Sequence, residues 1–132
     1  MIRPILATLL GLALLAPHGA MAQEDPAKER AKQLFIQGSQ HYQAGRFEQA
    51  LVAFEQANAI KPHPLMLYNI AQVQEAMGRA PEALTTWKKY LATGPEDRDE
   101  PEERIAALEA EIQKNWSTIQ VITDPPGATL WI

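Results

Sequence analysis

The sequence predicts a mainly α protein: two helix–turn–helix repeats and a capping helix, followed by a short β-hairpin. Three observations predict it. Residues recur at an offset of 33, apolar residues recur every three to four positions through most of the chain, and apolar residues alternate with polar ones near the C-terminus. We therefore expect a leader over residues 1–22, a helical domain over residues 23–116 and the start of a β-module over residues 117–132.

The first 22 residues have the pattern of a secretory signal peptide. Arg3 supplies a positive start, residues 5–16 are almost wholly apolar, and Ala20 and Ala22 are the small residues that a signal peptidase reads. A membrane anchor is the alternative, but the apolar run is shorter than the about 20 residues that a spanning helix needs. We expect cleavage after Ala22, no transmembrane span in the mature chain, and an exported location in the periplasm or cell envelope.

The middle of the chain holds two copies of one 33-residue unit. The matching pairs are Gly45 with Gly78, Arg46 with Arg79, Ala50 with Ala83, Leu51 with Leu84, Phe54 with Trp87, and Pro62 with Pro95. Repetition at such a period is typical of stacked supersecondary units. Helical spacing of the apolar residues divides each copy into two amphipathic helices. Gly45 and Gly78 fall between these helices, where a residue free to adopt positive φ lets the chain reverse.

Prolines mark the predicted helix ends. Asp25 and Pro26 begin the first helix, because the carboxylate caps free amides and the missing proline N–H costs nothing at the first position. The other prolines that stop or open helices within the repeats are Pro62, Pro64, Pro81 and Pro95. The prolines thus predict where each repeat begins and ends.

A fifth helix is predicted from Pro101 to Trp116. Ile105, Leu108 and Ile112 line one face of it, while its glutamates point outward. Repeat arrays generally need about three units to close a core, so we expect this helix to cap the second repeat. The acidic run of residues 96–103 is predicted to be a solvated entrance to the helix.

After Trp116 the period changes to alternation. Ile119 and Val121 share one face, residues 124–127 read Asp-Pro-Pro-Gly, and the alternation resumes over residues 128–132. This pattern predicts a β-hairpin with a type II turn. Because two strands are marginal alone, we expect either a truncated module or a hairpin that docks on the helices or a partner.

The first copy resembles a tetratricopeptide repeat in the order of its small, aromatic and proline positions. These are Leu34, Gly38, Tyr42, Gly45, Phe47, Ala50, Phe54, Ala57 and Pro62. In the second copy Ala71 stands in place of Gly38, Ala80 in place of Phe47, and Tyr90 in place of Ala57. The resemblance covers about residues 31–95 and implies stacked helix pairs.

The C-terminal segment resembles the opening of a PEGA domain, a small β-module of bacterial cell-envelope proteins. The motif after which the family is named lies at residues 125–128, where Gly127 and Ala128 are kept and Pro126 replaces the glutamate. This family continues for several more strands. The resemblance implies attachment or orientation at the cell envelope.

The composition of the chain argues against catalysis, metal binding and nucleic-acid binding. The chain has no cysteine, a net charge of −4 and no basic run that would neutralise a nucleic-acid backbone. Its glycines form no phosphate loop, its carboxylates lie on predicted solvent faces, and His18, His41 and His63 have no partners at metal-ligand spacing. We therefore expect no enzyme activity, no cofactor, no metal and no nucleic-acid partner.

The resemblance to tetratricopeptide repeats implies a binding groove lined by the first helix of each repeat. The matching positions are Phe35, Ser39, Tyr42, Gln43, Leu65, Tyr68, Asn69, Gln72 and Glu75. Such a wall would hold a protein or peptide by apolar contact and amide hydrogen bonds. Tyr42 and Leu65 have an alternative place in the core between repeats. Asn69 matches the carboxylate clamp of the family, but Phe35 and Ser39 replace its Lys and Asn, so a free carboxylate is expected to meet no positive charge.

Three functions fit the sequence. The first is an exported, non-catalytic adaptor of the cell envelope that binds a protein or peptide in the groove. The second is a structural spacer or a self-association module that forms a homo-oligomer, and its β-module makes the envelope attachment. The third is contact with peptidoglycan or another carbohydrate through Trp116 and Trp131, for which ordinary packing is the alternative.

Overall fold

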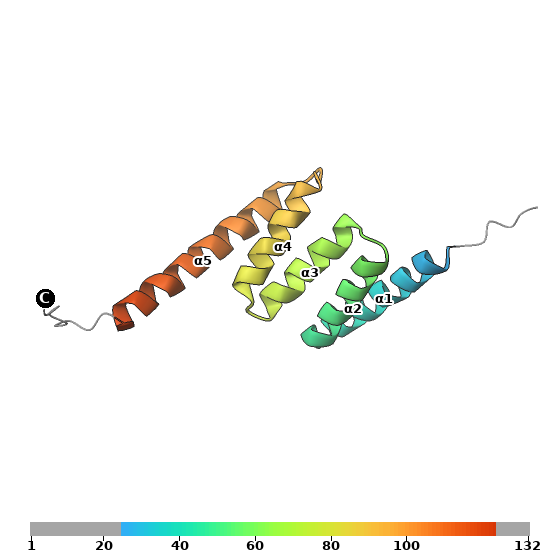
Figure 1. The fold of residues 1–132 in the computed structure, drawn as a ribbon, viewed down its shortest axis with the longest axis horizontal. Helices are drawn as coiled ribbons and strands as arrows, with labels where there is room; N and C mark the ends of the chain where they lie inside the picture. The colour runs from blue at the N-terminus through green and yellow to red at the C-terminus, as the bar shows by residue number, and fades with distance from the viewer. Residues whose placement is uncertain (1–24, 124–132) are drawn as a thin grey trace, which may run out of the picture.

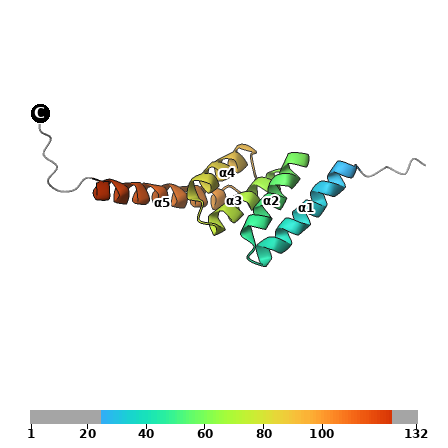
Figure 2. The same cartoon turned by 60° about the horizontal axis from the view of Figure 1, so that its bottom comes forward.

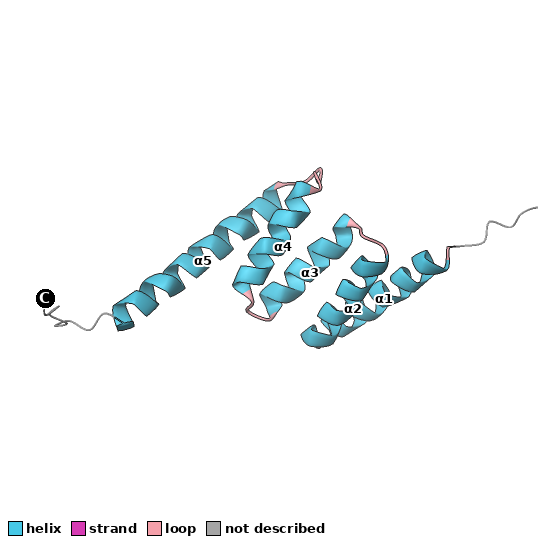
Figure 3. Ribbon diagram, viewed as in Figure 1, coloured by secondary structure: helices cyan, strands magenta, loops and turns pink. Residues whose placement is uncertain are grey.

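The structure, a computed structural model, describes residues 25–123, with side-chain surroundings as far as Thr118 (Figure 1). The described elements are all helices joined by short loops (Figure 3). They are α1 (Pro26–Gln43), α2 (Phe47–Ile60), α3 (Pro64–Ala76), α4 (Ala80–Ala92) and α5 (Asp99–Thr123). Each helix packs chiefly on its neighbours in sequence, so the helices form a row of antiparallel pairs. The predicted helical repeats are confirmed.

The repeat boundaries form as predicted. The Asp25 carboxylate accepts a hydrogen bond of 3.0 Å from the Ala27 amide, and Pro26 occupies the first turn of α1. Gly45 and Gly78 both adopt φ of 71° and reverse the chain between the helices of each pair. Since this backbone conformation is strained for residues with a Cβ, glycine is the natural residue there.

Two buried clusters form the core. The first cluster contains Ala50, Leu51, Phe54, Ile70 and Val73, and joins α2 to α3. The second contains Ala71, Ala80, Ala83, Trp87 and Leu108, and joins α3, α4 and α5. The predicted pairing of a small residue with an aromatic four positions later is therefore confirmed in both repeats.

Gly38 allows the closest approach within the first repeat. A Cβ built on Gly38 would lie 2.7 Å from the Phe54 ring, closer than such atoms pack in folded proteins. The ring is itself 1% exposed, so its close-packed surroundings limit how far it can shift. The close packing of α1 on α2 therefore favours glycine at this position.

Helix α5 packs on the second repeat as the predicted capping helix, but it is longer than predicted. Leu108 is buried in the second cluster, with Ile105 and Ile112 packed against it. The helix begins at Asp99 rather than Pro101, and it continues to Thr123, beyond the end of α4 (Figure 2). None of the helices in residues 25–123 combines the length and the apolarity that a bilayer crossing requires.

The first arm of the predicted hairpin is helical. Ile119 and Val121 fall within α5, because short apolar runs fit both the strand and the helix period and the helical register of Ile112, Trp116 and Ile119 prevails. The rest of the hairpin and the predicted leader lie outside the described residues. The hairpin is thus not confirmed.

Candidate binding groove

The candidate groove residues lie on α1 and α3. They recur at three and four positions along each helix, which places them on one face of α1 and one face of α3. The structure brings members from both helices together around two hollows, one toward the start and one toward the end of the helices. Each hollow has its own chemistry.

The first hollow, named here the lysine cleft, lies between the starts of α1 and α3. It has a volume of about 490 Å³. The cleft is lined by Lys28, Ala31, Lys32, Phe35, Lys61, Pro62, His63, Leu65 and Met66. Two predicted groove residues, Phe35 and Leu65, are thus brought together from different helices.

The second hollow, named here the arginine hollow, lies toward the C-terminal ends of α1 and α3. It has a volume of about 300 Å³ and is lined by Tyr42, Gln72, Glu75, Ala76 and Arg104. Seven residues of α1 separate Phe35 from Tyr42, which corresponds to roughly 10 Å along the helix. An extended peptide of a few residues is long enough to span that distance.

A polar network fixes the arginine hollow. Arg104 of α5 donates a hydrogen bond of 3.3 Å to Glu75 and lies 3.9 Å from Glu100. The Glu75 carboxylate also accepts a hydrogen bond from the Trp87 indole. The Tyr68 hydroxyl donates to Glu100 at 3.1 Å. The network ties α3, α4 and α5 together at the wall of the groove.

The Tyr68 hydroxyl titrates above its usual range. Burial is the main cause of its raised pKa, followed by the hydrogen bond to Glu100 and the negative charge of that carboxylate. Its ring also packs edge-on against Trp87, with centroids 5.2 Å apart. Tyr68 is therefore committed to joining helices, and it lines neither hollow.

Three other candidates stand apart from the two hollows. Ser39 donates its hydroxyl to the Phe35 carbonyl at 3.0 Å, and Asn69 donates its amide to the Leu65 carbonyl at 2.6 Å. Both groups are occupied by their own helix. Gln43 is exposed but lines neither hollow. The structure thus gathers Phe35, Leu65, Tyr42, Gln72 and Glu75.

Tyr42 and Leu65 remain accessible. The Tyr42 side chain is 37% exposed and packs against Phe47 with ring centroids 5.6 Å apart, and Leu65 is 46% exposed. Neither residue belongs to a buried cluster. Their alternative place in the core between repeats is therefore wrong.

Four cations of the groove were not among the predicted residues. Lys28, Lys32 and Lys61 border the lysine cleft, and Arg104 borders the arginine hollow. The expectation that a free carboxylate meets no positive charge at the clamp positions stays a prediction, although lysines lie beside Phe35 in the lysine cleft. Lys28 and Lys32 precede Phe35 by seven and three positions, a spacing that the sequence displays. Lys61 and Arg104 come from other segments, and only the packing of the helices brings them in.

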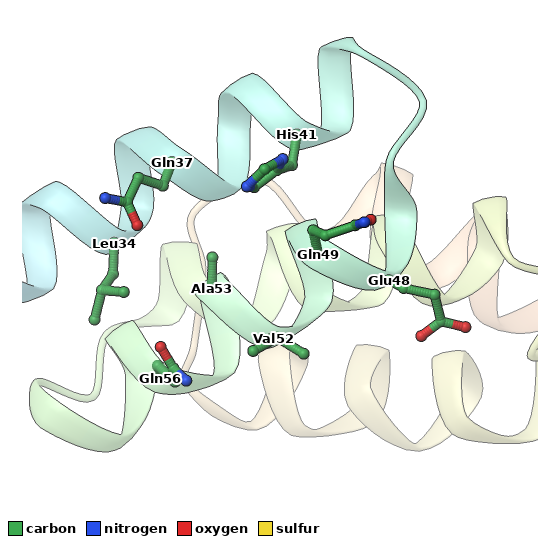
Figure 4. Close-up of a pocket in the computed structure, with 8 residues that line it drawn as sticks. All are labelled: Leu34, Gln37, His41, Glu48, Gln49, Val52, Ala53 and Gln56. Atoms are coloured by element: carbon green, nitrogen blue, oxygen red, sulfur yellow. The ribbon is translucent and has the colours of Figure 1, made fainter.

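A further hollow lies on a different face of α1, between α1 and α2 (Figure 4). It is lined by Leu34, Gln37, His41, Glu48, Gln49, Val52, Ala53 and Gln56. Val52 is 51% exposed there, close to the exposure of Leu65 in the groove. This outer hollow offers a matched reference surface for experiments on the groove.

The histidines in the described part of the chain have structural partners. His41 Nδ1 accepts a hydrogen bond of 2.9 Å from Arg46, and His63 Nδ1 accepts one of 3.1 Å from the Leu65 amide at the start of α3. Within residues 25–123, no three His, Asp or Glu side chains gather as metal ligands. The absence of cofactors and of catalysis stays a prediction.

Trp116 stands alone on the far part of α5. Its side chain is 63% exposed, so it does not pack at a junction within the described residues. Trp131, its predicted companion in carbohydrate contact, lies outside them. Carbohydrate binding stays a prediction.

Comparison with known families identifies a match to a repeat family. The sequence model described as tetratricopeptide repeat matches residues 41–112, which is more than half of the chain. The matched region runs from the end of α1 into α5 and includes the arginine hollow. No curated protein matches the chain.

Proposed function

The chain belongs to the tetratricopeptide repeat family, and on this premise we propose that it is a non-catalytic adaptor that holds a protein or peptide against α1 and α3. Repeats of this family generally mediate interactions between proteins, and the family is typically non-catalytic. We further propose export to the periplasm or cell envelope. That part of the proposal rests on the leader pattern of residues 1–22 and the PEGA-like motif of residues 125–128.

One observation carries the proposal of a groove. Exposed side chains from α1 and α3 surround two neighbouring hollows, and they include the apolar Leu65 and the aromatic Tyr42, which are 46% and 37% exposed. Gln72 adds an amide able to donate to and accept from a peptide backbone. Apolar contact combined with backbone hydrogen bonding is a recurring mode of peptide recognition.

The test compares two double variants that make similar substitutions on two different surfaces. Leu65→Ser with Gln72→Ala alters the groove, and Val52→Ser with Gln49→Ala alters the outer hollow of Figure 4. Each pair removes one exposed aliphatic side chain and one amide, so both variants are expected to keep the parent melting temperature. The chain from residue 23 to residue 132 serves as bait in an envelope extract, with quantitative mass spectrometry as the readout.

Loss of captured proteins by the groove variant, with full capture by the outer variant, supports the adaptor. Equal capture by both variants contradicts it. Tyr68 is left unchanged in this test, because its ring joins the packing of α3 on α4.

The alternative of a spacer or self-association module draws support from the projection of α5 beyond α4 (Figure 2). Two measurements separate it from the adaptor. A bait ending at Thr123 keeps all of α5, so partners lost with residues 124–132 place the function in the C-terminal module. Sedimentation that shows a dimer weakened by the groove variant, but not by the outer variant, indicates self-association.

A further inference from the structure

The lysines of this protein are unevenly placed. The chain has six, and three of them, Lys28, Lys32 and Lys61, line the lysine cleft. They come from the first turns of α1 and from the loop between α2 and α3. The other three, Lys88, Lys89 and Lys114, lie on α4 and α5 and line neither hollow of the groove. One end of the groove therefore concentrates ammonium groups.

Apolar side chains form the floor between these ammonium groups. Phe35 is half-buried against the first core cluster, Met66 is half-buried, and Leu65 is exposed. The cleft they share with Ala31 and Pro62 has room for a large aliphatic or aromatic side chain at about 490 Å³. An apolar anchor surrounded by positive charge suits a ligand that carries an apolar residue among acidic ones.

The carboxylates already near the cleft do not close it. Lys61 lies 3.6 Å from Asp25, and Lys32 lies 3.9 Å from Glu29. All four side chains are at least 42% exposed, so these contacts contribute little free energy and leave the ammonium groups accessible to solvent. The cleft keeps its cationic character.

The opposite end of the groove differs in charge. Arg104 is matched there by Glu75 and Glu100, so the arginine hollow has no excess of positive charge among its own groups. Because only the lysine cleft has an excess of positive charge, the two possible directions of a bound peptide along the groove are not equivalent. Charge complementarity of this kind acts on specificity and association rate.

We propose that the lysine cleft recognises an acidic peptide segment, with one apolar side chain seated between Phe35 and Leu65 and its carboxylates facing Lys28, Lys32 and Lys61. This inference rests on the proposed groove and specifies the class of its ligand. A second copy of this chain is a poor occupant. Its own acidic run, residues 96–103, contains no apolar residue except Pro101, which is buried.

The test measures fluorescence anisotropy with three short labelled peptides. The first carries two leucines among glutamates, the second replaces every glutamate by lysine, and the third replaces both leucines by serine. We expect the first peptide to bind at least about tenfold more tightly than either other peptide at low salt, and its affinity to fall as salt screens the lysines.

Two triple variants provide matched controls. Lys28→Gln, Lys32→Gln and Lys61→Gln empty the cleft of charge, whereas Lys88→Gln, Lys89→Gln and Lys114→Gln change net charge equally elsewhere. The first variant is expected to lose about tenfold in affinity for the acidic peptide, and the second less than about twofold. Circular dichroism checks that both variants melt as the parent does.

Three results overturn the inference: equal binding of acidic and basic peptides, equal loss in both triple variants, or sedimentation showing that a second copy occupies the cleft. Failure here is separable from failure of the groove. If the Leu65→Ser and Gln72→Ala variant loses captured proteins while the cleft lysine variant keeps them, the groove stands and the acidic ligand does not.

Discussion

The two repeats place the same kinds of residue at positions 33 apart, yet they differ in polarity. In the first repeat Phe35 packs against Phe54, with ring centroids 5.7 Å apart. In the second repeat Tyr68 and Trp87 take the equivalent positions, and both carry a polar atom that reaches a carboxylate, Glu100 or Glu75. The positions of the packed rings are thus repeated, whereas the polar groups on those rings differ according to the carboxylates that lie nearby.

A second pair of positions shows the same difference in a buried setting. Gln74 and Thr86 of the second repeat are 9% and 7% exposed and share a hydrogen bond of 2.7 Å. Their counterparts in the first repeat are His41 and Ala53, which line the outer hollow of Figure 4. The second repeat is therefore held by specific polar contacts where the first relies on apolar packing and open surface.

The largest effect is expected from truncating the central aromatic of each repeat. Phe54→Ala and Trp87→Ala both empty a site that is at most 1% exposed, and each should cost about 3–5 kcal/mol of unfolding free energy. Trp87→Ala should lie at the upper end, because it also removes the indole donor of Glu75. Urea unfolding measures both, and a smaller loss for Trp87→Ala would contradict the greater role given to the polar network.

The next effect comes from the buried polar pair. Thr86→Val leaves the Gln74 carbonyl without its hydroxyl donor and should cost about 2 kcal/mol. Thr85→Val is the matched control, since Thr85 is exposed and bonds only its own helix, and it should cost less than about 0.5 kcal/mol. Equal losses in urea unfolding would show that the Gln74 contact adds no stability.

Gly38→Ala tests the apolar frame of the first repeat. The new Cβ would press on the Phe54 ring, and the strain should exceed the gain in helix propensity by about 1 kcal/mol. Alanine already occupies the equivalent position in the second repeat, where Ala71→Gly should also destabilise by about 1 kcal/mol. Combining Gly38→Ala with Phe54→Leu should cost less than the sum of the two, and strict additivity would rule out the clash.

The smallest effect concerns alkaline pH. Because folding raises the pKa of Tyr68 above its ordinary value near 10, the unfolded chain loses this proton first as pH rises. The stabilisation that the Tyr68 hydroxyl gives to the folded state is therefore complete below about pH 10, and it is lost as pH increases through the folded pKa. Tyr68→Phe, which copies the first repeat, should flatten the fall in stability above about pH 10. An unchanged slope would assign that fall to other groups.

Particular residues show what could be predicted from sequence. Asp25, Gly45 and Gly78 act through local rules, since capping and positive φ depend on a few neighbouring residues. Ala83 and Trp87 were recognisable because their spacing repeats that of Ala50 and Phe54. The extent of α5 was misjudged, because a short apolar run such as residues 119–122 fits a helix as well as a strand.

The groove was predictable only in part. Phe35, Tyr42, Leu65, Gln72 and Glu75 follow from position along a helix face, and the structure brings them to the two hollows. Tyr68 lines neither hollow, and its hydrogen bond to Glu100, more than 30 positions away, could not be predicted from the sequence. Lys61 and Arg104 were also not predicted, because only the packing of the helices places them beside the two hollows.

The sequence by itself determined the helices, their caps and the frame on which they stack, since these depend on local dihedral preferences and on a periodic apolar face. Tertiary structure alone decided which charges meet. The cationic character of the lysine cleft requires the loop carrying Lys61 to lie beside the start of α1, and the neutrality of the arginine hollow requires α5 to place Arg104 against Glu75. Electrostatic interaction depends on distance through space, and separation along the chain does not report that distance until the helices have packed.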